Sequence, residues 1–211
     1  VLNLRRLAPR LPQPDARARG IALHDVMERF LKSHADWSGD LHAARATLAE
    51  ATSALDRHAE DAGIRALWRA RLLGVADRLI AGEARRLADA EPVFFEEEGR
   101  LPLPGTQFTL KARPDRIDRM RDGCYAVRDY KSGMPPSLKQ VRTLEKQLPL
   151  EAAMVEAGAF PGLPPGPVAA MTYIALGASG ADREIPVEED GNRLADQAIA
   201  ELERLVRAYD R

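Results

Sequence analysis

The chain has 211 residues, of which 45% are hydrophobic and 30% are charged. This composition is typical of a soluble globular protein with one sizeable core, and no apolar run is long enough to cross a membrane. With 31 basic and 32 acidic residues, the overall charge favours no class of partner. Any binding of nucleic acid must therefore come from locally clustered arginines. The single cysteine, Cys124, excludes a disulfide framework, a Cys-rich zinc site and an all-Cys iron–sulfur cluster within this chain, and it fits a cytoplasmic location.

The first 90 residues predict three helices. Apolar residues recur at helical spacing from Asp15 to about His34, from about Leu41 to Ala59 and from about Gly63 to Ala88. The N-terminus lacks the continuous apolar run of a signal peptide. Because the chain starts abruptly without an initiator methionine, we expect it to be a fragment of a longer chain.

Beyond Pro92 the pattern changes to that of strands. Apolar and polar residues alternate with a period of two, which predicts three strands centred near residues 96, 111 and 127. The dipeptide Asp122-Gly123 supplies the turn of the last hairpin. We expect the three strands to pair as an antiparallel meander.

The last third of the chain alternates between helix and strand. Residues 139–158 predict a helix, in which Pro149 is tolerated in the first turn if the helix begins near Lys146. Residues 168–176 form a short apolar run typical of a buried strand, and residues 190–209 predict a final helix. This order predicts a single α/β (or mixed α+β) domain over 1–211, with a helical part in 1–90 and a sheet core with flanking helices in 91–211.

Two acidic residues and a lysine stand out in the predicted hairpin. Asp129 and Lys131 lie two residues apart and share one face of their strand, and the turn returns Asp129 to the neighbourhood of Asp115. Two close carboxylates repel each other unless a cation lies between them, and hard oxygen ligands favour Mg²⁺ or Mn²⁺. A lysine beside such an ion suits metal-dependent phosphodiester hydrolysis. On spacing alone, a solvated pair of Asp129 and Lys131 remains the alternative.

Three further residues bear on that alternative. His24 lies among apolar residues of the first predicted helix, where a histidine is commonly a core residue. Gln147 and Glu151 are one turn apart on a later helix, and both fit an ordinary surface. Along the chain a histidine on a helix is followed by an aspartate on one strand, Asp-x-Lys on the next strand and a glutamine at the start of a helix. This order favours one shared site over separate core and surface roles for these residues.

The segments GIALH, RPDRID, DYKSG and QLPLEAA together resemble a known family. They are similar to RecB-type nuclease domains of the PD-(D/E)xK superfamily, and within it to the C-terminal nuclease domain of AddB in bacterial AddAB helicase–nucleases, particularly the alphaproteobacterial kind. The resemblance covers residues 16 to 180 and implies a restriction-endonuclease-like core, with a mixed central sheet flanked by helices.

The resemblance also implies roles for individual residues. Asp115 and Asp129 correspond to the metal-binding carboxylates, and His24 and the backbone carbonyl of Tyr130 to further metal ligands. Lys131 corresponds to the catalytic lysine. Gln147 corresponds to a glutamine that contacts the substrate backbone or the water of the site, and Glu151 stands where many relatives have tyrosine. An additional acidic ligand is expected upstream, for which the candidates are Glu83, Glu97 and Glu98, with Glu98 preferred.

Other charged residues of the hairpin have less specific interpretations. Asp118 faces away from Asp115 on a regular strand, so we expect a structural role and a pairing with Arg116 or Arg119. Cys124 is expected to be incidental to its turn. DNA phosphates could contact Arg113, Arg116 and Arg128, although an ordinary solvated face explains them equally well.

The expected function is therefore a Mg²⁺-dependent deoxyribonuclease, with Mn²⁺ as a substitute and without an iron–sulfur cluster. The resemblance implies a role in double-strand break repair. The substrate would be DNA, delivered as single strands by a helicase, and the partner would be an AddA-like subunit. No interaction with a membrane is expected. The alternative is a non-catalytic DNA-binding or scaffold module of such a complex. A stand-alone nuclease of CRISPR adaptation is a third interpretation, but those proteins usually carry the missing cysteine cluster.

Overall fold

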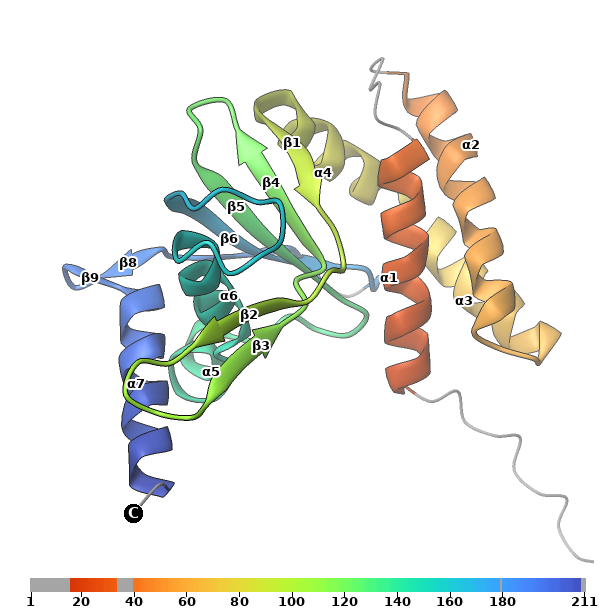
Figure 1. The fold of residues 1–211 in the computed structure, drawn as a ribbon. Coiled ribbons are helices and arrows are strands. Elements are labelled where there is room, and N and C mark those ends of the chain that lie inside the picture. Colours follow the sequence, from red (N-terminus) through yellow and green to blue (C-terminus); the bar gives the residue numbers. More distant parts are fainter. Residues whose placement is uncertain (1–15, 34–39, 179, 210–211) are drawn as a thin grey trace, which may run out of the picture.

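The computed structural model describes residues 16–33, 40–178 and 180–209 (Figure 1). Its helices are α1 (Ala16–Ser33), α2 (Leu41–Ala51), the 3-10 helix η1 (Thr52–Arg57), α3 (Ala62–Leu73), α4 (Ala76–Asp89), α5 (Leu138–Thr143), α6 (Gln147–Glu156) and α7 (Leu194–Tyr209). Its strands are β1 (Ala90–Phe94), β2 (Gly99–Pro102), β3 (Thr109–Ala112), β4 (Arg116–Met120), β5 (Tyr125–Lys131), β6 (Val168–Ala175), β7 (Arg183–Ile185), β8 (Glu188–Glu189) and β9 (Asn192–Arg193).

A five-stranded mixed sheet in the order β1-β4-β5-β6-β7 forms the centre of the fold. Strand β5 occupies the middle, antiparallel to β4 and parallel to β6. It is buried from Tyr125 to Tyr130, because other elements cover both faces of the sheet. Polar residues of β5 on either face are therefore inside the protein, where they need partners.

Two apolar cores lie on opposite faces of this sheet. Helices α1 to α4 form a layer on one face, where Val26 and Phe30 of α1 share a core with Tyr130 and Ile174. On the other face, Leu148 of α6 shares a second core with residues of β5 and β6, and α7 packs against α6 (Figure 1). The apolar stripe of α1, at helical spacing, fixes which side of that helix meets the sheet.

The expected meander is wrong in two respects. The strand near residue 111 pairs with β2 in a separate two-stranded sheet, and β4 takes its place beside β5. Residue 96 lies between β1 and β2 instead of within a strand. Pro114 explains the interruption between β3 and β4, since proline cannot donate a hydrogen bond within a sheet. The turn at Gly123, with φ +87°, joins β4 and β5 as predicted.

The helical predictions hold with altered bounds. The helix expected over 41–59 gives way to η1 at Thr52, and the one expected over 63–88 is broken after Leu73 into α3 and α4. The predicted ends Asp15 and His34 of the first helix lie outside the described residues. Residues 139–158 contain two helices, and Pro149 lies in the first turn of α6 as expected.

The strand predicted over 168–176 is confirmed as β6, and the last helix begins at Leu194 instead of residue 190. The three short strands β7, β8 and β9 were not predicted. The mixed α/β class with a helical N-terminal part is confirmed. Within the described residues, no helix is both long and apolar enough to span a lipid bilayer.

Candidate active site

The site lies where β5 ends and β4 begins. The register pairs Arg116 with Arg128, which brings Asp115, just before β4, beside the C-terminal half of β5. Asp115 Oδ2 accepts a hydrogen bond of 2.7 Å from the backbone N–H of Tyr130. The antiparallel pairing therefore fixes Asp115 beside Tyr130 and leaves its second oxygen, Oδ1, free for another partner.

His24 reaches this point from α1, across 106 residues of sequence. Its Nε2 lies 2.6 Å from the carbonyl oxygen of Tyr130, and its Nδ1 lies 3.1 Å from Asp115 Oδ1. Because a carbonyl can only accept, Nε2 carries a proton and Nδ1 faces the carboxylate. Burial lowers the pKa of His24, but the Asp115 carboxylate outweighs burial and raises the pKa above its ordinary value.

Glu96 completes a cluster of three potential ligands. One oxygen of each carboxylate and one ring nitrogen, from His24, Glu96 and Asp115, lie within 4.8 Å of one another. Glu96 has a positive φ of 50°, and its backbone N–H donates to the carbonyl of Pro114. This local conformation holds its carboxylate toward the site. Burial, followed by the charge of Asp115, raises the pKa of the Glu96 carboxyl.

The three expected acidic candidates lie elsewhere. Glu98, the preferred one, forms ion pairs with Arg100 and Lys111 on the surface. Glu97 is exposed, and Glu83 is fully buried on α4, where it accepts hydrogen bonds from Arg86 and Arg116. Sequence reasoning found the right run of glutamates but missed Glu96, because the backbone conformation that directs it inward leaves no signal in the residue pattern.

Lys131 extends the site along the α6 side of β5. Its Nζ lies 2.9 Å from Asp129 Oδ2, donates to Gln147 Oε1 at 3.1 Å and lies 5.1 Å from the centre of the Tyr173 ring. Asp129 and Lys131 share one face of the strand, as their spacing predicts. Asp129 is almost fully buried, so this ion pair is not the solvated surface pair that spacing alone allowed.

Gln147 and Glu151 continue the chain of contacts onto α6. The side-chain amide of Gln147 donates to Glu151 Oε1 at 3.2 Å, and Glu151 is buried. Burial, followed by the charge of Asp129, raises the pKa of Glu151 to about 8. Burial and then the charge of Asp115 raise the pKa of Asp129 to about 6. Both carboxyl groups are consequently shifted toward their protonated forms.

This set of donors suits a divalent cation. Hard carboxylate oxygens and an imidazole nitrogen are ligands for Mg²⁺ or Mn²⁺, and the excess of acidic groups favours a bound positive charge. A ligating histidine commonly donates its other ring N–H to a backbone carbonyl, as His24 does to Tyr130. His24, Glu96 and Asp115 could hold the ion directly. Asp129 lies next to this trio, paired with Lys131.

Two of the three arginines expected to contact DNA are inside the protein. Arg116 is fully buried and binds Glu83 and Asp118, and Arg128, 8% exposed, binds Asp118 and Thr172. The prediction that they reach DNA phosphates is therefore wrong, because their guanidinium groups are already neutralised and covered. Arg113 is exposed and pairs with Glu96, beside the site.

Asp118 has the structural role that its position on β4 suggested. Its pairing with Arg116 is confirmed, and its second partner is Arg128 instead of Arg119. Cys124 lies in the β4–β5 turn, where its backbone N–H donates to Asp122 Oδ1. Neither residue contributes a side chain to the candidate site.

Comparison with known proteins agrees with this geometry. An uncharacterized protein of Rickettsia bellii (strain RML369-C) is 24% identical over 163 residues, which are 76% of this chain and 20% of that protein. The chain thus spans about a fifth of the length of this relative. Residues 1–211 match the family described as the PD-(D/E)XK nuclease superfamily. Because this match covers the whole chain, the chain belongs to the PD-(D/E)XK nuclease superfamily.

Proposed function

We propose that this protein is a Mg²⁺-dependent deoxyribonuclease that hydrolyses phosphodiester bonds, with Mn²⁺ as an effective substitute. The observation that carries the proposal is the convergence of His24, Glu96 and Asp115 on one point, with Lys131 two residues along the strand from Asp129. A divalent ion there would lower the pKa of a bound water and polarise a phosphoryl oxygen.

The residues of the chain have separate tasks in this proposal. Asp115 is oriented by the Tyr130 N–H, and His24 by the Tyr130 carbonyl, so both ligands are aligned by one peptide segment. Lys131 is held between Asp129 and Gln147, which directs an ammonium group toward the place where charge develops on phosphate. Gln147 is in turn oriented by Glu151, which accepts a hydrogen bond from its side-chain amide.

The finer assignment places this nuclease in DNA end processing coupled to a helicase, in double-strand break repair. Support comes from the resemblance of the four motifs to AddB nuclease domains, and from a relative five times longer than the matched segment. An AddA-like motor subunit would then deliver single strands to the site in the cytoplasm. The complete set of acidic ligands and lysine supports catalysis over a scaffold role, which would not require them.

The test is cleavage of labelled single-stranded and double-stranded DNA, and of RNA, with Mg²⁺, with Mn²⁺ and with chelator. Lys131→Ala should lose cleavage, whereas Lys111→Ala, the same change on β3 away from the cluster, should retain it. Equal cleavage by both variants would remove Lys131 from the mechanism. DNA binding by the parent without cleavage under any metal condition would support the scaffold alternative instead.

A further inference from the structure

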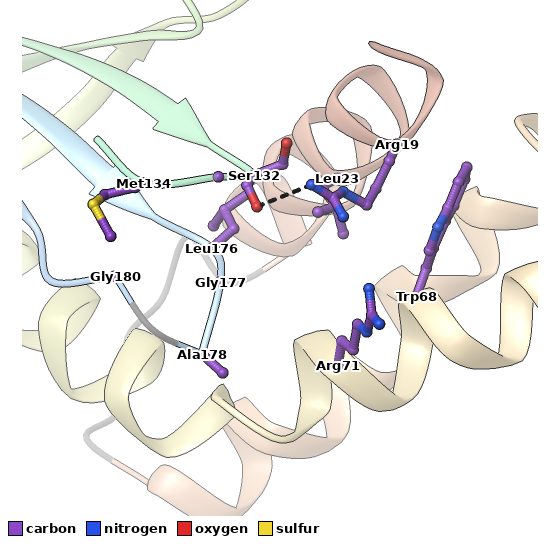
Figure 2. Close-up of a pocket in the computed structure, with 11 residues that line it drawn as sticks. Arg19, Leu23, Trp68, Arg71, Ser132, Met134, Leu176, Gly177, Ala178 and Gly180 are labelled. Carbon is purple, nitrogen blue, oxygen red and sulfur yellow. Dashed lines mark hydrogen bonds between the residues drawn. The ribbon is translucent and has the colours of Figure 1, made fainter. Parts of the chain in front are cut away.

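A cavity of about 350 Å³ opens beside the candidate active site (Figure 2). Arg19 and Leu23 of α1 line it, together with Trp68 and Arg71 of α3. Its other wall is formed by the segments that follow β5 and β6, which are residues 132–134, 176–178 and 180. Figure 2 shows Arg19 and Arg71 directed toward the same space from two different helices.

Two buried donors of this cavity lack acceptors among the described residues. Its described lining contains two arginines and no acidic residue. Arg19 makes one long contact, 3.5 Å from an amino group to the carbonyl of Ser132, while its buried Nε has no acceptor among the described residues. Trp68 is 3% exposed, and its indole N–H likewise has no acceptor among them. Buried donors without acceptors indicate a missing partner.

The missing partner should be an anion with several oxygens. Arginine presents a planar fork of N–H groups that matches phosphate, and Arg71 adds a second guanidinium from the opposite helix. The volume lies at the lower end of the range for small-molecule sites, about 300 to 1,000 Å³. One phosphate with its adjoining sugar fits this volume, and Trp68 is too deeply buried to stack on a base.

The cavity is joined to the candidate site through two shared elements. Ser132 and Gly133 directly follow Lys131, and Arg19 precedes His24 by five residues on the same helix. Helix α1 thus contacts the end of β5 twice, through His24 at the Tyr130 carbonyl and through Arg19 at the Ser132 carbonyl. A strand whose phosphate lies at the metal ligands would pass this cavity with a neighbouring phosphate.

We propose that Arg19 and Arg71, with Trp68 in the wall between them, form a subsite for a backbone phosphate of the DNA strand, adjacent to the phosphate that is cleaved. The subsite rests on the proposed nuclease function and adds to it a fixed path for the strand between α1 and α3. Through this subsite the nuclease would contact the sugar–phosphate backbone independently of base sequence.

The primary test measures binding without metal, so it does not depend on catalysis. A fluorescently labelled deoxythymidine strand is titrated in chelator at several KCl concentrations. Each phosphate contact contributes about 0.7 to the slope of log K against log salt for single strands, so Arg71→Ala should reduce the slope by about this amount. Arg71 is exposed, so its removal leaves the packing of α3 intact. Arg19→Gln should reduce the slope in the same way.

The matched control is Arg204→Ala on α7, an exposed arginine on the far side of the sheet (Figure 1). It should leave the slope unchanged. A slope for Arg71→Ala equal to that of Arg204→Ala would overturn the subsite. Binding of inorganic phosphate or deoxythymidine monophosphate as tightly as the strand, lost in Arg71→Ala, would also overturn it, by making the cavity a site for free phosphate compounds.

A second measurement locates the phosphate along the strand. Strands with one neutral methylphosphonate linkage at successive positions are cleaved with Mg²⁺. When the neutral linkage is next to the cleaved bond, cleavage by the parent should be slower than that of the unmodified strand. Arg71→Ala should cleave the two strands at the same rate. If the neutral linkage slows both proteins equally at every position, the subsite is contradicted while the nuclease proposal stands. If no strand is cleaved by the parent, the nuclease proposal fails, while the salt slopes still decide whether the cavity binds the backbone.

Discussion

Two clusters of charged side chains lie beside the same strand pair, and they differ in their balance of charge. On the α4 side, the balanced cluster consists of Glu83, Arg116, Asp118 and Arg128. On the other side and at the strand end, the acid-rich cluster consists of His24, Glu96, Asp115, Asp129, Lys131 and Glu151. In the first cluster each carboxylate has a guanidinium partner, whereas in the second the acids outnumber the cations.

The pKa shifts show what this difference means. Burial alone would raise the pKa of Glu83, but Arg116 and Arg86 outweigh burial and lower it to about 2. In the acid-rich cluster, burial and neighbouring carboxylates raise the pKa of Asp129 to about 6 and of Glu151 to about 8. The charges of the balanced cluster are therefore neutralised by its own arginines, whereas the acid-rich cluster keeps an excess of carboxylates that would favour a bound cation.

The largest expected effect is on catalysis in the acid-rich cluster. Asp115→Asn removes an anionic ligand but keeps the oxygen that accepts from Tyr130, so cleavage should fall about 10⁴-fold, equivalent to about 5 kcal/mol, with little loss of stability. Rates and melting temperatures measure the two effects. Asp122→Asn, the same change in the exposed β4–β5 turn, is the control and should cleave normally. A variant at position 115 that cleaves like this control would contradict the ligand assignment.

Breaking the balanced cluster should affect stability instead. Arg116→Met leaves Glu83 and Asp118 buried without their shared partner and should cost about 3–5 kcal/mol of unfolding free energy. Arg119→Met, on the same strand but exposed and 3.9 Å from Glu91, should cost about 0–1 kcal/mol. Urea unfolding of both variants gives the comparison. Similar losses in the two would show that burial of Arg116 does not decide its contribution.

Acid should weaken the balanced cluster. Because the folded pKa of Glu83 lies near 2 and its ordinary value is 4.5, its contribution of about 3 kcal/mol is fully present above pH 4.5 and is lost as the pH falls toward 2. Unfolding free energies measured from pH 6 downward should decline more steeply for the parent than for Glu83→Gln. Parallel curves for the two proteins would assign acid sensitivity to other carboxylates.

A divalent cation should stabilise the acid-rich cluster. Mn²⁺ at 100 times its dissociation constant should raise the unfolding free energy by about 2.7 kcal/mol in the parent and in Asp122→Asn, but not in Asp115→Asn. Thermal melts with and without Mn²⁺, together with calorimetric titration, measure this linkage. A metal response that survives in Asp115→Asn would place the ion elsewhere.

The smallest effect is expected at Glu151. Because its pKa is raised to about 8, it is neutral at pH 7, and Glu151→Gln should keep cleavage within about threefold, which is about 0.6 kcal/mol. Above pH 8 the parent gains a buried negative charge that the variant lacks, so their pH–rate profiles should separate there. A large loss at pH 7 would indicate that Glu151 acts as an anion.

Part of the candidate site, the convergence of Asp115, Asp129 and Lys131, was predictable because these residues obey local rules. The spacing of Asp129 and Lys131 fixes their common face, and the turn at Gly123 brings Asp115 back to them. The balanced cluster was not predictable in the same way. A polar residue on one face of a strand, such as Arg116, gives the same alternating pattern whether that face meets solvent or a helix, and only the packing of α4 decides.

The other errors have a similar cause. Glu96 was missed because its inward direction depends on a positive φ held by contacts with Pro114. The break at Gly74 separates α3 from α4 although the apolar pattern continues across it, because a helical pattern marks which faces are buried and not where the axis changes direction. Tertiary packing therefore supplied what residue spacing could not.

The bond between His24 and the carbonyl of Tyr130 has a consequence for how activity is lost. It joins a helix of the N-terminal layer to the central strand, so the candidate ligands come together only while that layer is packed on the sheet. A protein that retained both parts but let them slide by one helical turn would keep its helices and strands and lose the cluster of His24, Glu96 and Asp115. During gradual denaturation, cleavage activity should therefore be lost before the helices and strands unfold. The loss of activity would report the separation of the helical layer from the sheet.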